Sequence, residues 1–195
     1  MVKEINMKGL ILCGGHSTRM QQEKSNIAYH GMPQWQYLYT LLQALIPDVY
    51  LSCRADQQPA FTDNVPVITD SIEGGGPAVG LLSAHALYPD SAWLVLACDL
   101  PLISLRSLSL LVDSHQPEKD ATAFISPFNQ LPEPLIAIWE PTGLMLLKQS
   151  FGAGKNCPRK ALLQGNIEVI ENPFATEQFN ANTPEEMQEA KEKLH

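Results

Sequence analysis

The chain has 195 residues, 45% of them hydrophobic and 17% charged, which is the composition of a globular protein with a sizeable core. There are 13 Lys and Arg against 21 Asp and Glu, so the formal net charge is −8 and the pI is near 5.0. Extensive binding to nucleic acid or to an anionic membrane needs a net basic face, so this balance argues against both. A small basic pocket for a phosphorylated ligand stays compatible with it.

The sequence shows no sign of a membrane span or a secretory leader. The apolar run 92–98 is far shorter than the roughly 18–20 residues that a span needs. The first residues mix charges and contain no apolar core, so we expect a cytoplasmic protein.

The cysteines and histidines do not indicate a metal site. The 4 cysteines form no CxxC pair and the 5 histidines show no HExxH spacing. Cys13, Cys53 and Cys98 each end an apolar run, so we expect them to be buried, reduced thiols.

Strands and helices alternate along the chain. The expected strands cover 7–13, 49–53, 65–68, 92–98, 121–126, 135–139 and 167–170; the expected helices cover 35–46, 77–87, 105–112, 142–149 and a last segment from Pro184. Thr183, Pro184 and Glu186 form a capping box that starts the last helix. The pattern predicts an α/β, Rossmann-like three-layer fold around a mostly parallel, partly mixed central sheet, in one domain over 1–195.

A glycine pair after the first strand is the first candidate ligand site. Gly14 and Gly15 allow a sharp turn and a close approach of the backbone to a ligand. Such a loop presents N–H groups to an anion, and Arg19 and Lys24 add two cations nearby. The segment is neither a Walker A loop nor GxGxxG. A phosphate loop and a tight turn beside two solvated cations both remain open from these residues alone.

The string GGHSTRM at 14–20, followed by Lys24, resembles the signature G-G-x-S-x-R-M-x-x-x-K of nucleotidyltransferases that act on molybdopterin, most closely the molybdenum cofactor guanylyltransferase family. Members usually carry Gly and Asp where this chain has Gln21 and Glu23. The resemblance implies that Arg19 and Lys24 neutralise the triphosphate as catalytic residues. It implies nucleotide contacts from four further residues, Leu12, Cys13, Gly14 and Gly15.

The segment 70–80 is the second candidate site. Three consecutive glycines at 74–76 are an entropic liability unless the backbone must leave room for something. The segment is similar to the family's Asp followed by Gly-Pro-x-x-Gly, which implies that Asp70, Gly76 and Pro77 contact the nucleoside. A flexible surface loop before a helix is the alternative.

Asp99 ends the most apolar strand, at the position where open α/β sheets bind their ligands. Cys98–Pro101 resembles the family's C-D-x-P motif, which implies that Asp99 binds a catalytic Mg²⁺ and the nucleotide. Mg²⁺ is commonly held by one or two carboxylates together with substrate phosphates. The alternative is a helix cap, although Ser104 is better placed for that role.

Asn182 belongs to a stretch similar to the family's N-x-N-T-P-E-E, which implies a second ligand for the metal or a phosphate. A plain helix start is the alternative. Residues 134–139 resemble the strand that lines the acceptor side, and the basic cluster 155–160 could meet the acceptor's phosphate or be a solvated loop. His16 is expected to be exposed.

Together these motifs imply transfer of GMP from GTP to molybdopterin with release of pyrophosphate and with Mg²⁺ as cofactor. The expected partners are therefore GTP and a molybdopterin-type phosphorylated acceptor, with no nucleic acid or membrane, in a monomer or weak homo-oligomer. Alternatives are CTP on molybdopterin, an NTP on a sugar or polyol phosphate, or a nucleotide-binding module without turnover.

Overall fold

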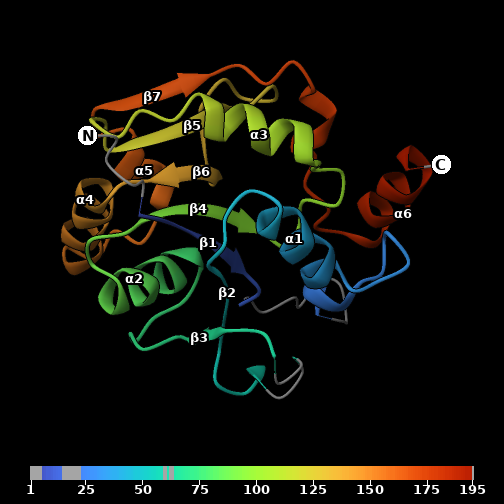
Figure 1. The fold of residues 1–195 in the computed structure, drawn as a ribbon, viewed down its shortest axis with the longest axis horizontal. Coiled ribbons are helices and arrows are strands. Elements are labelled where there is room, and N and C mark those ends of the chain that lie inside the picture. The colour runs from blue at the N-terminus through green and yellow to red at the C-terminus, as the bar shows by residue number, and fades with distance from the viewer. Residues whose placement is uncertain (1–5, 15–22, 59–60, 62–63, 195) are drawn as a thin grey trace.

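A computed structural model describes residues 6–14, 23–58, 61 and 64–194. These residues form one sheet of seven strands in the order β3-β2-β1-β4-β6-β5-β7 (Figure 1). The strands are β1 Met7–Leu12, β2 Val49–Cys53, β3 Val67–Thr69, β4 Ala92–Ala97, β5 Ala121–Ile125, β6 Pro132–Trp139 and β7 Ile167–Ile170. Within this described sheet, β6 alone runs against its neighbours β4 and β5, and the other pairs are parallel. The predicted mixed sheet is confirmed.

Helices cover both faces of the sheet, so the fold has three layers. The helices are α1 Gln34–Gln43, α2 Pro77–Leu87, α3 Leu105–Asp113, α4 Pro141–Gly152, α5 Pro158–Leu162 and α6 Pro184–Lys193, with short 3₁₀ turns η1 Lys24–Asn26 and η3 Ala175–Gln178. One core lies between the sheet and the pair α1 and α3, and another lies between the sheet and α2, α4 and α5 (Figure 1). Because both faces are covered, β4 is buried at every position and its sequence is apolar throughout.

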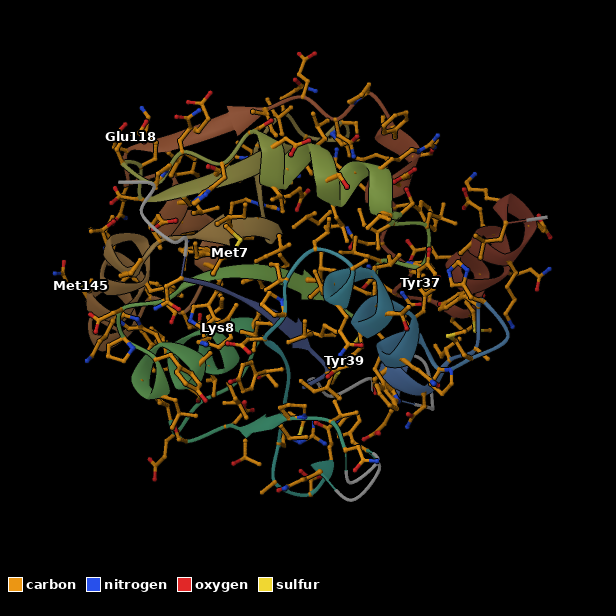
Figure 2. The ribbon with its side chains drawn as sticks, in the orientation of Figure 1. Met7, Lys8, Tyr37, Tyr39, Glu118 and Met145 are labelled. Atoms are coloured by element: carbon orange, nitrogen blue, oxygen red, sulfur yellow. The ribbon has the colours of Figure 1, made fainter. Side chains whose placement is uncertain are left out.

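Two side chains connect α1 to the loop that follows β4. Gln34 donates to the carbonyl of Leu100 at 3.0 Å, and the Tyr37 hydroxyl donates to that of Ile103 at 3.0 Å. Figure 2 labels Tyr37 on α1. The loop that carries Asp99 is thereby held against a helix on one face of the sheet.

The expected cysteine burial is confirmed. Cys13, Cys53 and Cys98 are free and buried, whereas Cys157 is exposed. Among the residues described, no helix is both long and apolar enough to cross a membrane.

Two local expectations are wrong. Residues 158–162 form the short helix α5 rather than part of a solvated loop. Ser104 occupies the N-cap position of α3, but its side chain does not cap the helix, because its hydroxyl donates to Glu177 at 2.7 Å.

Candidate active site

The carboxyl ends of the four parallel strands β1 to β4 meet at one edge of the sheet. Gly14, Arg54, Asp70 and Asp99 follow these strands within two residues of their ends. Ligands of open α/β sheets bind at this edge, where loops diverge from the strand ends.

Lys24, Asp99 and Asn182 come together there although they are far apart in the sequence. Lys24 Nζ donates to Asn182 Oδ1 at 2.6 Å and lies 3.8 Å from Asp99 Oδ2. The backbone N–H of Ala181 donates to the carbonyl of Asp99 at 2.9 Å, which fixes the Asn182 segment against the end of β4. The structure therefore places a cation, a carboxylate and an amide at one point.

Burial controls the charge state of Asp99. Loss of hydration raises the pKa of the Asp99 carboxyl, and the nearby Lys24 ammonium lowers it again in part. Burial, and secondly the Asp99 charge, raises the pKa of the neighbouring Tyr29 hydroxyl to about 12. The Asp99 carboxylate therefore lies in a poorly hydrated site, and among the described residues the Lys24 ammonium is the cation that compensates its charge.

The Asp99 site fits a magnesium ion. Asp99 Oδ1 is buried and has no hydrogen-bond partner among the described residues, so one hard oxygen is free to bind a cation. Within those same residues no group of three or more His, Cys, Asp or Glu side chains could hold a metal. One carboxylate together with substrate phosphates is a usual way of binding Mg²⁺.

Glu23 fixes the position of the chain just before Lys24. Its carboxylate accepts from Gln57 Nε2 at 3.0 Å and from Asn26 Nδ2 at 3.3 Å. Gln57 is buried in the loop after β2 and also accepts from the backbone N–H of Arg54 at 3.1 Å. Glu23 therefore links the segment before Lys24 to the end of β2.

A hollow lies at the same edge of the sheet, beside the ends of β1, β2 and β3. It is lined by Leu12, Gly14, Ser52, Arg54, Asp70, Gly74, Gly75, Gly76, Pro77 and Gly80. Gly76 has φ 84° at the N-cap of α2, a conformation that favours glycine, and Pro77 begins the helix. Burial raises the pKa of Asp70, while Arg54 and a hydrogen bond from Ser52 lower it.

The glycine at 80 lets α2 approach the sheet. A Cβ at this position would overlap Ser52 Oγ and lie 2.8 Å from Leu12 Cδ2. We expect Gly80→Ala to lower the free energy of unfolding by about 1–3 kcal/mol, because overpacking forces α2 away from β1 and β2. Urea unfolding measures this, with Gly152→Ala as the control, since a Cβ on Gly152 meets nothing within 4 Å. Equal stability of the two variants would contradict the close approach.

The residues expected to bind the nucleotide have different surroundings. Leu12, Gly14, Asp70, Gly76 and Pro77 line the hollow. Cys13 is buried with its Sγ 3.3 Å from Cys98 Sγ, and its backbone N–H and that of Gly14 both donate to the Ser52 carbonyl, at 2.8 and 3.2 Å. These two donors are therefore engaged within the fold.

Gly15, His16, Arg19 and Gln21 lie outside the described residues.

Sequence reasoning missed Ser52, Arg54 and Gly80 in the lining of the hollow. Ser52 and Arg54 carry no recognised motif, although their place at the end of a predicted parallel strand was a usable signal. Gly80 belongs to the quoted Gly-Pro-x-x-Gly segment.

Residues 9–169 match the model of the MobA-like NTP transferase domain family. A molybdenum cofactor biosynthesis bifunctional protein of Synechocystis is 33% identical over 186 residues, which cover 95% of this chain and 54% of that relative. This chain thus spans about half the length of the bifunctional relative. A molybdenum cofactor guanylyltransferase of Pseudomonas aeruginosa is 31% identical, with 90% of each chain covered.

Solved structures share the fold. Molybdopterin-guanine dinucleotide biosynthesis protein A from Archaeoglobus fulgidus superposes with a TM-score of 0.80 at 20% identity, covering 96% of this chain and 98% of that one. A 4-diphosphocytidyl-2C-methyl-D-erythritol synthase from Anaerococcus prevotii superposes with a TM-score of 0.72 at 11% identity, covering 96% and 95%. Since proteins named for different nucleotides have this fold, the fold by itself does not select the base. The family match over residues 9–169 means that this chain belongs to the MobA-like NTP transferase domain family.

Proposed function

We propose that the chain transfers GMP from GTP to the terminal phosphate of a molybdopterin-type acceptor and releases pyrophosphate. The observation that carries the proposal is the position of Lys24 Nζ, 3.8 Å from Asp99 Oδ2 at the sheet edge that also holds the hollow. The guanylyltransferase name of the Pseudomonas relative, which aligns over 90% of each chain, supports GTP as donor.

In the proposed reaction an oxygen of the acceptor phosphate attacks the α-phosphorus of GTP. The bond from that phosphorus to the oxygen bridging the α- and β-phosphates breaks, and pyrophosphate leaves with the electron pair. Lys24, together with Arg19, stabilises the charge on the departing pyrophosphate. The protein's task is positioning and charge stabilisation, so the reaction needs no covalent protein intermediate.

Asp99 would hold Mg²⁺ through its free oxygen Oδ1. Asn182 would add a second oxygen ligand on release of Lys24, which occupies its Oδ1 in this structure. When bound, Mg²⁺ supplies positive charge next to the reacting phosphates. Because Asp99 lies two residues past the end of β4, the carboxylate that would hold the metal stands close to a rigid strand end.

The acceptor would enter on the β6 side of Asp99. Arg159 on α5 donates to the Pro132 carbonyl at 3.1 Å and to Glu133 Oε2 at 2.9 Å, so α5 is fixed to the start of β6. Lys155 and Lys160 are exposed on the same segment and could meet the acceptor's phosphate. We also propose that the reaction takes place in the cytoplasm and involves no nucleic acid.

Pyrophosphate release tests the proposal. The protein would be incubated with Mg²⁺, molybdopterin and each of GTP, CTP, ATP and UTP in turn. We expect release with GTP and the acceptor. Release with molybdopterin and CTP, but not with molybdopterin and GTP, would favour the cytidylyl alternative. Release only after molybdopterin is replaced by a sugar or polyol phosphate would favour that acceptor class. Calorimetric binding of GTP without release under any condition would favour a module without turnover.

Lys24→Met is expected to lower kcat/KM for GTP at least roughly tenfold, equivalent to about 1.4 kcal/mol of transition-state stabilisation. The variant keeps the length of the side chain but removes the charge that lies near Asp99. Steady-state pyrophosphate release measures the effect. Lys148→Met, on the exposed side of α4, is the control and should match the wild type. Unchanged kinetics for Lys24→Met would make its role at the triphosphate untenable.

A further inference from the structure

Arg54 lines the hollow and carries a buried nitrogen that has no hydrogen-bond partner among the described residues. It is the first residue after β2, and its Nε and Nη2 donate to the two carboxylate oxygens of Asp56 at 3.0 and 3.1 Å. Its remaining nitrogen, Nη1, is buried and finds no hydrogen-bond partner in the described part of the chain. The bidentate contact with Asp56 fixes the plane of the guanidinium, so Nη1 is a donor held in place without an acceptor.

Asp70 supplies an acceptor in the same hollow. It follows β3, and its backbone N–H donates to the carbonyl of Cys53 at 2.9 Å, which joins its position to the strand that precedes Arg54. Its carboxyl is half-buried and responds to the charge of Arg54. The glycines at 74–76 leave one wall of the hollow without side chains, so a flat ring could enter. One fixed donor and one acceptor therefore lie in a single hollow.

This pair matches one edge of guanine. Guanine presents the acceptor O6 next to the donors N1–H and N2–H₂, whereas adenine presents a donor at position 6 and an acceptor at N1. Arg is the side chain most often used to recognise guanine acceptors. We propose that Arg54 determines the base specificity of this chain, with Nη1 donating to O6 of guanine while Asp70 accepts from N1–H and N2–H₂. The inference rests on the proposed function for the identity of the nucleotide.

A phosphate contact would be the other use of this guanidinium, and it makes a different prediction. A cation that binds the triphosphate contributes to every NTP alike, because the phosphates are common to all four. A donor to O6 contributes to GTP and ITP, which carry that oxygen, and contributes nothing to ATP. The pattern of losses across nucleotides therefore separates the two roles.

The experiment measures binding of GTP, ITP and ATP by calorimetry to the wild type and to Arg54→Met. The wild type should bind GTP most tightly, ITP more weakly because it lacks the N2 amine, and ATP least. Arg54→Met should lower the affinity for GTP and for ITP roughly tenfold or more and leave that for ATP unchanged. Lys119→Met removes a cation at the other end of the sheet, where its Nζ contacts Asn166, and should change none of the three.

Equal weakening of all three nucleotides by Arg54→Met would overturn the inference in favour of a phosphate contact, and an unchanged GTP affinity in a folded variant would overturn it outright. A circular dichroism spectrum identical to that of the wild type shows that the variant is folded. Because binding needs no turnover, the proposed function is judged separately. A wild type that binds GTP in the expected order but releases no pyrophosphate leaves the role of Arg54 supported and the transfer reaction refuted.

Discussion

Asp99→Asn is expected to lower the turnover of Mg²⁺-dependent transfer at least roughly a hundredfold, the scale seen when one group that stabilises transition-state charge is removed. Asn keeps the shape of the side chain but replaces the free anionic oxygen Oδ1 with a neutral group that binds Mg²⁺ poorly. Steady-state pyrophosphate release measures the loss. Asp113→Asn, an exposed carboxylate at the end of α3, is the matched control. Near-normal turnover of a folded Asp99→Asn variant would remove Asp99 from the site.

The same substitution should raise the stability of the fold at neutral pH. Burial raises the pKa of Asp99 above that of the unfolded chain, so the ionised carboxylate disfavours the folded state. The destabilisation appears as the pH rises through the folded-state pKa and is absent below about 3.9, the ordinary pKa of Asp. We therefore expect a higher Tm for Asp99→Asn than for the wild type at pH 8, with the difference shrinking on acidification.

A lower Tm for Asp99→Asn at pH 8 would mean that the Lys24 contact at 3.8 Å outweighs the burial of the charge. The same raised pKa predicts that transfer activity falls as the pH drops through it, because the protonated carboxyl cannot bind a cation. A pH–rate profile of kcat checks this.

A strand that is covered on both faces can be recognised from its sequence alone, because every position is apolar. Ala92–Ala97 is apolar at every position because α-helices lie on both sides of β4, and the expected strand 92–98 extends only one residue beyond the observed one. The irregular second half of the chain indicated a mixed sheet, and β6 is the antiparallel strand responsible. Such features depend on local patterns and simple sheet geometry.

Contacts between distant segments account for what local patterns missed. Ser104 has the residue type of an N-cap, but Glu177, 73 residues later, takes up its hydroxyl and its backbone N–H. No short window of sequence contains both Ser104 and Glu177. The helix α5 was missed for a different reason: it is only five residues long, too short for a periodic apolar pattern, and Pro158 is its one clear signal.

The candidate site likewise contains residues that the sequence predicted and residues that it did not. Asp99 and Lys24 were predicted because each belongs to a recognisable string, and the structure brings their side chains together. The sequence indicates that Arg54 follows a strand, but its place in the hollow also depends on β2 lying between β1 and β3. Strand order is the information that local sequence lacks.

Glu177→Ala is expected to lower the free energy of unfolding by about 3 kcal/mol, because two or more hydrogen bonds to a buried carboxylate disappear. Glu177 is 5% exposed. Its carboxylate accepts from the backbone N–H and hydroxyl of Ser104 at 3.1 and 2.7 Å, from the Ser107 hydroxyl at 2.6 Å and from Arg106 Nε at 2.6 Å. These contacts occupy the first turn of α3, where no side chain of α3 or of its N-cap caps the helix.

Urea unfolding followed by circular dichroism measures the loss of stability. Glu118→Ala is the control: Glu118 is exposed at the end of the molecule away from α6, and its removal should change stability by less than about 0.5 kcal/mol (Figure 2). Glu177→Gln keeps an acceptor oxygen and should lose less than Glu177→Ala. A loss below about 1 kcal/mol for Glu177→Ala would show that solvent replaces these bonds.

Glu177 also lies in the segment that leads to Asn182, so the stability effect should be accompanied by an effect on transfer. The backbone of Ala181 and the side chain of Asn182 meet Asp99 and Lys24 only if the chain from η3 onward keeps its path. Loosening its attachment to α3 allows Asn182 to move away from Lys24, so kcat should fall. The affinity for GTP, which the hollow sets, should stay near that of the wild type. Equal changes in kcat and in GTP affinity would instead indicate a general loosening of the fold, because the hollow is formed by β1 to β3 and α2, which Glu177 does not contact.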